Sequence, residues 1–236
     1  MPSSAAAPAV RAIDAVRAIG ADVLALLLAA TCAGCDAPET LLCASCRQRI
    51  RARPVATSTQ AGLLVRAAMP FESVPARCVR RLKDEGETRL AHPLGVALGE
   101  VLRGVLEARP AGDVAVVPVP SSRAAFRRRG YRVPDLLIRR AGYAPRRLLS
   151  TRRPTADQRG LDVESRSRNV HGSMCAKGSG GLAVVLVDDV MTTGATLDEA
   201  ARALRVAGAH VLSAVVLAAT PRHSERNAYA SETRRK

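Results

Sequence analysis

Aromatic residues are almost missing from this 236-residue chain, which contains two Phe, three Tyr and no Trp. Proteins that bind single-stranded nucleic acid without sequence preference stack bases on aromatic side chains, so this chain has little from which to build such a surface. Its core must consist mainly of Ala, Val and Leu. Because 47% of the residues are hydrophobic, a folded core is still expected, with disorder limited to the ends.

Acidic residues are also scarce relative to basic ones: 21 Asp and Glu stand against 36 Lys and Arg, a formal net charge of +15. This excess favours polyanionic partners such as nucleic acid, phosphates or diphosphates. The alternative is that arginine serves here as the ordinary solvated surface residue, and the charge alone does not separate the two.

No apolar run is long enough to cross a bilayer, so no membrane span is expected. The apolar run ADVLALLLAATC, residues 21–32, ends in a cysteine, which raises the alternative of a secretory or lipoprotein signal. Charges of both signs precede it at helical spacing, however, and an amphipathic helix over residues 12–29 is the favoured interpretation.

Four of the six cysteines lie close together as two CxxC pairs separated by seven residues: Cys32, Cys35, Cys43 and Cys46. Such clustering indicates a metal in a reducing cytoplasm rather than disulfides, and four thiolates suit a tetrahedral, structural zinc ion. An iron–sulfur cluster and metal-free or redox-active thiols remain alternatives. Cys78 and Cys175 stand alone and are expected to be small buried apolar residues.

The rest of the sequence alternates between strand-like and helical patterns. We expect strands near residues 62–75, 114–120, 145–150, 169–174, 182–189 and 210–220, and helices within residues 76–108, 121–142 and 196–206. This alternation predicts an α/β fold with a parallel sheet flanked by helices. The expected domains are residues 1–60 (helix, four-cysteine knuckle and basic linker), 61–222 (α/β domain) and 223–236 (polar tail).

The stretch VVLVDDVMTTGATLDEA, residues 184–200, places two aspartates at the end of an apolar strand. Ligands of parallel sheets bind beyond the carboxyl ends of such strands. The following turn, residues 192–196, offers backbone N–H groups, a glycine and threonine hydroxyls at a helix N-terminus, and so predicts an anion site. It lacks the Gly-Lys-Ser/Thr of a Walker loop, so one phosphate monoester fits better than a triphosphate. The carboxylates of Asp188 and Asp189 are suited to ribose hydroxyls or magnesium.

VVLVDDVMTTGATL resembles the phosphoribosyl diphosphate (PRPP) motif of type I phosphoribosyltransferases. Together with the cysteine knuckle, VVPVPSSRAAFRRRGY and RPTADQRGLDVESRSRNVHGSM, it is similar to the ComF family, the competence protein F and amidophosphoribosyltransferase-like group. The resemblance extends over residues 20–219 and implies a type I phosphoribosyltransferase fold with a small zinc-knuckle module.

The resemblance also implies roles for individual residues. Asp188 and Asp189 would hold the ribose hydroxyls, and residues 118–122 would lie beside the diphosphate. The groups expected to bind the substrate are Thr192, Thr193, Gly194, Ala195, Thr196, Ser121, Ser122 and Arg123. Residues 152–168 would form a lid over the leaving diphosphate, with Arg153, Gln158, Arg166 and Asn169 at its recognisable positions, Arg153 and Arg166 acting in catalysis. An ordinary solvated basic loop is the alternative for this segment.

The chain departs from the family pattern after Tyr131. An Asn-Gln pair is usual there, but this sequence has Arg132 and Val133. This change bears on the acceptor side of the pocket and on whether the chain catalyses a transfer.

Two functions follow from these patterns. The first is a magnesium-dependent transferase that moves phosphoribose from PRPP to a nitrogen acceptor with release of diphosphate. The second is a non-catalytic ComF-type accessory protein of competence and DNA uptake that senses a phosphoribosyl ligand. In that case the knuckle and the basic segment RQRIRAR would bind a protein of the competence machinery or DNA.

Overall fold

The computed structural model describes residues 31–108, 113–152 and 171–220. The helix predicted over residues 12–29 and the polar tail predicted from residue 223 lie outside these ranges. The chain divides into two units, one ending at Gln48 and the other beginning at Arg49. No helix in the described ranges is long and apolar enough to span a membrane.

The described part of the first unit is a short knuckle followed by helix α2, Ala44–Arg49. Its chain doubles back between Thr31 and Pro38, which form an isolated antiparallel bridge. The N–H of Cys32 donates to the carbonyl of Ala37 at 2.7 Å within this turn. The two CxxC pairs are thereby carried on the turn and on the start of α2.

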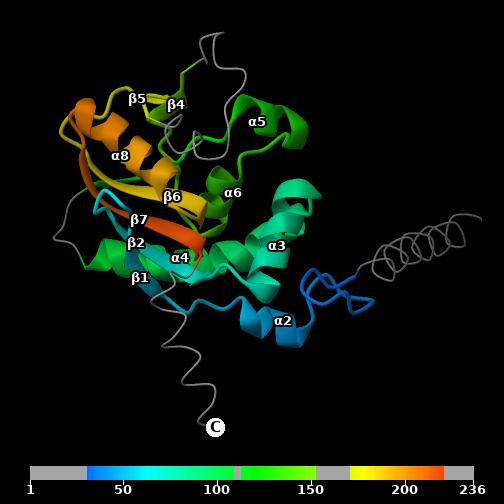
Figure 1. The fold of residues 1–236 in the computed structure, drawn as a ribbon. Helices are drawn as coiled ribbons and strands as arrows, with labels where there is room; N and C mark the ends of the chain where they lie inside the picture. The colour runs from blue at the N-terminus through cyan, green and yellow to red at the C-terminus, as the bar shows by residue number, and fades with distance from the viewer. Residues whose placement is uncertain (1–30, 109–112, 153–170, 221–236) are drawn as a thin grey trace, which may run out of the picture. The chain divides into compact units, whose positions relative to one another are not determined.

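A five-stranded sheet with the strand order β1-β2-β7-β6-β3 forms the centre of the second unit (Figure 1). Strands β2, β7, β6 and β3 are parallel, and β1 pairs antiparallel at one edge. The strands are β1 Val55–Ser58, β2 Leu64–Pro70, β3 Val114–Pro118, β6 Ala183–Met191 and β7 His210–Ala219.

Helices cover both faces of this sheet (Figure 1). Helix α8, Ala195–Val206, packs on β6 and β7 from one side, while α4 packs on β2, β7 and α6. Val184 to Val187 of β6 are all buried, and their side chains point alternately to the two faces. The remaining helices are α3 Ser73–Asp84, η1 Thr88–Leu90, α4 Ala91–Glu107, α5 Arg123–Arg129 and α6 Val133–Arg140. This arrangement confirms the predicted α/β class.

A separate two-stranded antiparallel ribbon joins β4, Leu149–Thr151, to β5, Met174–Ala176. Most of the segment between these strands, including the predicted lid residues Arg153, Gln158, Arg166 and Asn169, lies outside the described residues. Glu199 of α8 fixes the ribbon, because its carboxylate accepts the N–H of Met174 at 2.9 Å.

The structure corrects three expectations about strand boundaries. Residues 55–58, predicted as linker, form β1 because their backbone groups find hydrogen-bond partners in β2. Strand β6 does not end at the aspartates but continues to Met191, because β7 offers backbone partners as far as Ala219. The strand predicted over residues 169–174 begins only at Met174, where pairing with Thr151 starts.

Candidate functional site

The turn between β6 and α8 has the backbone geometry expected of an anion site. Gly194 has φ +87° and precedes the first residue of α8, a conformation that favours glycine. A Cβ at this position would lie 2.9 Å from Cγ2 of Thr59, so the turn also packs closely on the β1–β2 connection. Thr192, Thr193 and Thr196 are exposed, with their hydroxyls at the positive end of a twelve-residue helix.

The acid pair, Asp188 and Asp189, lies in the last part of β6. Asp189 is buried, and Lys83 from the last turn of α3 places its Nζ 2.9 Å from Oδ2 of Asp189. Oδ1 of Asp188 accepts the N–H of Asp189 at 2.8 Å. Removal from water, and then the negative charge of Asp189, raise the pKa of Asp188 well above the usual range of a carboxyl. The two neighbouring carboxylates thus have one cation, Lys83, beside them and are suited to a further cation or to hydroxyl donors.

Beyond the acid pair lies a pocket of about 220 Å³, here called the acid pocket. It brings together five residues predicted from the sequence: Ser121, Ser122, Asp188, Asp189 and Thr196. Lys83, Val119, Pro120, Ala125, Arg129 and Pro134 complete the lining. The predicted phosphate-turn residues Thr192, Thr193, Gly194 and Ala195 stand before Thr196 and do not line this pocket.

The loop of residues 118–122 is held against β6 from its start. The N–H of Val119 donates to the carbonyl of Val187 at 2.8 Å. At its end Ser122 caps α5, because its Oγ accepts the N–H of Ala125 at 3.1 Å. The two serines therefore face the acid pair from a loop that is fixed at both ends.

Lys83 and Arg129 are pocket residues that the sequence did not reveal. Each comes from a helix distant from the motif, and each lies in a run of basic residues without any distinguishing pattern. Arg129 is 89% buried as a side chain, and Nη2 lies 3.5 Å from Oδ1 of Asp84. Within the described part of the chain its buried Nε has no hydrogen-bond partner.

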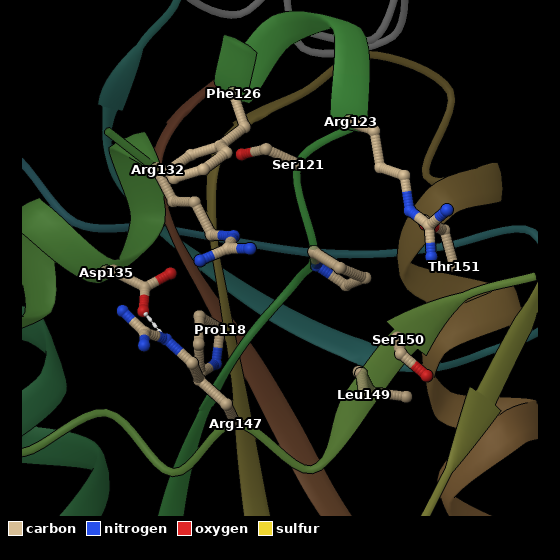
Figure 2. A pocket seen from close by; sticks show the side chains of 11 residues that line it. Pro118, Ser121, Arg123, Phe126, Arg132, Asp135, Arg147, Leu149, Ser150 and Thr151 are labelled. Atoms are coloured by element: carbon tan, nitrogen blue, oxygen red, sulfur yellow. Dashed lines mark hydrogen bonds and ion pairs between the residues drawn. The ribbon is translucent and has the colours of Figure 1, made fainter. Parts of the chain in front are cut away.

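A second cavity of about 200 Å³, here called the arginine pocket, lies beside the same loop (Figure 2). Its lining is Pro118, Pro120, Ser121, Arg123, Phe126, Arg132, Asp135, Arg147, Leu149, Ser150 and Thr151. Arg123, predicted beside the diphosphate, lines this cavity and not the acid pocket. Of the two residues that depart from the family pattern, Arg132 lines the cavity, whereas Val133 is buried at the start of α6.

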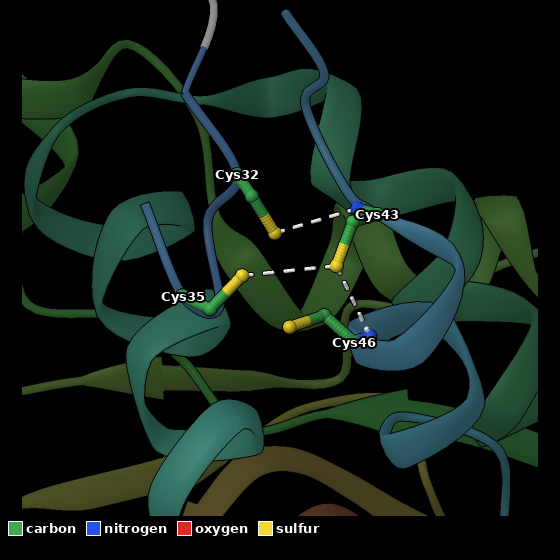
Figure 3. A group of neighbouring side chains, drawn as sticks. All are labelled: Cys32, Cys35, Cys43 and Cys46. Atoms are coloured by element: carbon green, nitrogen blue, oxygen red, sulfur yellow. Dashed lines mark hydrogen bonds between the residues drawn. The ribbon is translucent and has the colours of Figure 1, made fainter. Parts of the chain in front are cut away.

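The four cysteines of the first unit form one cluster (Figure 3). Their sulfur atoms all lie within 4.8 Å of one another. Burial raises the pKa of Cys32, but the backbone N–H groups of Cys43, Gly34 and Cys35 outweigh it and lower this pKa to about 6. Burial, and then the neighbouring thiols, raise the pKa of Cys46. Four thiol sulfurs this close are suited to one tetrahedral zinc ion, whose charge would stabilise all four thiolates.

Comparison with known proteins agrees with the fold. The family profile of the phosphoribosyl transferase domain matches residues 138–235, which include the acid pair and the phosphate turn but not residues 118–122. Residues 138–235 are therefore similar to phosphoribosyl transferase domains.

Two solved structures are similar to part of this chain. One is the allosteric regulatory enzyme of purine biosynthesis, with a TM-score of 0.34, and the other is glutamine PRPP amidotransferase from B. subtilis complexed with ADP and GMP, with a TM-score of 0.35. Each is 22% identical over 54% of this chain, which spans only 26% of either enzyme's length. A sequence comparison with curated proteins finds no match.

Proposed function

We propose that this chain binds PRPP with magnesium and transfers the phosphoribosyl group to a nitrogen acceptor, releasing diphosphate. One observation carries the proposal: the acid pocket joins Asp188, Asp189 and Thr196 to Ser121 and Ser122 across the ends of two parallel strands. Parallel sheets bind ligands at this edge, where a carboxylate pair and an anion site lie next to each other.

Each part of the pocket has a role in holding PRPP. The 5-phosphate would accept hydrogen bonds from the turn of residues 192–196, and the α8 dipole would stabilise its charge. Asp188 and Asp189 would accept hydrogen bonds from the two ribose hydroxyls. Ser121, Lys83 and Arg129 lie on the remaining walls and would face the diphosphate.

The acid pair also fits magnesium, which prefers one or two carboxylates together with substrate phosphates. Asp189 already has a cation, the Lys83 ammonium, 2.9 Å from its Oδ2. When bound, magnesium would neutralise charge on the diphosphate and make it a better leaving group.

In the reaction, the bond between ribose C1 and the diphosphate oxygen breaks, and a bond from the acceptor nitrogen to C1 forms. The acceptor nitrogen loses a proton and the diphosphate keeps the bonding electrons. Positive charge develops on the ribose, where the nearby carboxylates stabilise it. Arg153 and Arg166 are proposed to add positive charge at the diphosphate, and a closed lid would exclude water.

Calorimetry with PRPP and magnesium tests the pocket. Wild type and an Asp113→Asn control should bind alike, since Asp113 is an exposed residue away from the pocket. The double variant Asp188→Asn/Asp189→Asn should lose most of the affinity. Absence of heat with wild type, or equal binding by the double variant, would contradict the proposal. Diphosphate release across a panel of bases and amines then distinguishes transfer from binding alone.

The exposed arginines Arg47, Arg49, Arg51 and Arg53 favour a second function, the ComF-type accessory role in competence with DNA as partner. Phosphate contacts by arginine make affinity fall steeply with salt. Neutralising the four arginines should weaken a salt-dependent gel shift with duplex or single-stranded DNA. An unchanged shift would remove this segment as the contact surface.

A further inference from the structure

The arginine pocket and the acid pocket both adjoin the loop of residues 118–122. The two cavities have only Pro120 and Ser121 in common. Neither aspartate of the acid pair lines the arginine pocket, and neither does Thr196. An occupant of this cavity would therefore contact a different set of side chains from those proposed for PRPP.

The lining of the arginine pocket carries a surplus of positive charge. Three arginines stand against the single carboxylate of Asp135, a formal excess of two charges. Asp135 is buried and already accepts a hydrogen bond from Nε of Arg147. The attraction for an anion consequently rests on Arg132 and Arg123, supported by the terminal nitrogens of Arg147.

Arg132 is held in position before any ligand arrives. Its guanidinium carbon lies 4.4 Å from the centroid of the Phe126 ring, a cation–π contact. In Figure 2 its guanidinium points into the middle of the cavity, while Arg123 extends down the opposite wall towards Thr151. Because the contact with Phe126 fixes the Arg132 side chain, less conformational entropy is lost on binding.

Size and wall chemistry define the ligand class. The cavity volume of about 200 Å³ favours a small ligand. Pro118, Pro120 and Leu149 provide apolar wall between the charged groups. We propose that the arginine pocket binds a compact dianion, a phosphate or a small dicarboxylate, at a site separate from the acid pocket.

The position of the pocket makes its occupant an effector rather than the acceptor. The acceptor nitrogen must approach C1 from the side opposite the leaving diphosphate, whereas the arginine pocket adjoins the loop proposed to face that diphosphate. Since Ser121 lines both cavities, a dianion in the arginine pocket should change PRPP affinity, and PRPP should change dianion affinity by the same factor.

The test titrates malonate and inorganic phosphate separately into the full chain. Each titration is run with and without ribose 5-phosphate, which occupies the phosphate turn. With ribose 5-phosphate present, one remaining site per chain is expected, and Arg132→Gln or Arg123→Gln should weaken it about tenfold, as the loss of one charge-assisted hydrogen bond predicts. Binding of phosphate but not malonate would identify a phosphate ester as the ligand, and the reverse result a dicarboxylate.

Arg128→Gln is the matched control, because Arg128 is exposed on α5, the helix that carries Arg123, but does not line the cavity. An equal loss in this variant would show diffuse charge attraction and overturn the proposal. Failure of wild type to bind either anion would also overturn the proposal. So would an Arg132→Gln variant with lower affinity for PRPP but unchanged affinity for ribose 5-phosphate, since the cavity would then hold the diphosphate of PRPP. Malonate binding without any PRPP binding would leave this proposal standing and contradict the proposed function instead.

Discussion

Among single residues, Lys83 competes with any cation that binds the acid pair, because its ammonium is already paired with the carboxylate of Asp189. Its Nζ lies 2.9 Å from the buried carboxylate of Asp189, while the Lys83 side chain itself is 29% exposed. A ligand that uses Asp189 must displace this ammonium or share the carboxylate with it. The ion pair therefore affects both the stability of the protein and the affinity of the pocket for cations.

Replacing Lys83 with Met should lower the free energy of unfolding by about 2 kcal/mol, because a buried carboxylate loses its charged partner. The same change should raise the affinity for Mg²⁺ alone, since no ammonium competes for Asp189. Urea denaturation with and without Mg²⁺ measures both effects. Mg²⁺ should stabilise the variant more than wild type or a Lys177→Met control at an exposed lysine; an equal effect on all three would contradict the expected competition.

The acid pair and its neighbours also show what a sequence can reveal of a site. Asp188, Asp189 and Thr196 lie in one short motif whose chemistry is local, so their presence in a common pocket could be predicted. Lys83 and Arg129 belong to distant helices and reach the pocket only through tertiary packing. Nothing in a basic run such as RRLKDE distinguishes the lysine that forms an ion pair from the residues that surround it.

At the level of elements, α8 connects the phosphate turn to the ribbon that leads into and out of the predicted lid. Glu199 accepts the N–H of Met174 in β5 and is paired with Arg202 at 2.7 Å. Arg202 in turn donates to the carbonyl of Met174 at 3.4 Å. The backbone N–H and carbonyl of Met174 are thus both bonded to side chains of one helix, which fixes β5 relative to the turn.

This link predicts a pH dependence of stability. Burial raises the pKa of Glu199, but Arg202 and the Met174 N–H outweigh it and lower the pKa from 4.5 to about 2. The ionised Glu199 carboxylate stabilises the folded state by about 3 kcal/mol at pH values above its unfolded-state pKa. This stabilisation is lost as the pH falls from 4.5 towards 2.

Glu199→Gln should therefore destabilise the protein at neutral pH, and the difference from wild type should shrink at about pH 3. Urea denaturation midpoints at neutral pH and at about pH 3 measure this difference in stability. Glu100→Gln, at an exposed position of α4, is the control. A difference that does not change with pH would show that the charge of Glu199 is not the stabilising feature.

The alternation of elements was predictable because each buried strand and amphipathic helix has a local pattern. The limits of β1 and β6 were not, because they depend on partner strands. Val55 to Ser58 have no strong strand pattern, yet β2 gives them backbone partners. The aspartates interrupt the apolar run of β6, but a carboxylate side chain does not prevent its own backbone from pairing with β7.

For the whole molecule, the cysteine cluster predicts dependence of the first unit on metal. The described part of this unit is short, and a structural zinc ion can supply about 10 kcal/mol or more of folding free energy. Purified protein should contain one zinc per chain, measured by elemental analysis, and Cys35→Ser should lose it. Cys175→Ser, outside the cluster, should keep the metal. Iron with a visible chromophore, or no metal at all, would contradict the zinc assignment.

The position of β7 has a consequence for how the protein is made. This strand comes last among the described elements but lies between β2 and β6, and these two strands pair with it rather than with each other. Chains leave the ribosome from the N-terminus, so β1 and β2 wait unpaired with the rest of the sheet until residues 210–219 emerge. The five-stranded sheet is completed only after residues 210–219 have been synthesised, and a chain that stops before residue 210 leaves two half-sheets with no strand to join them.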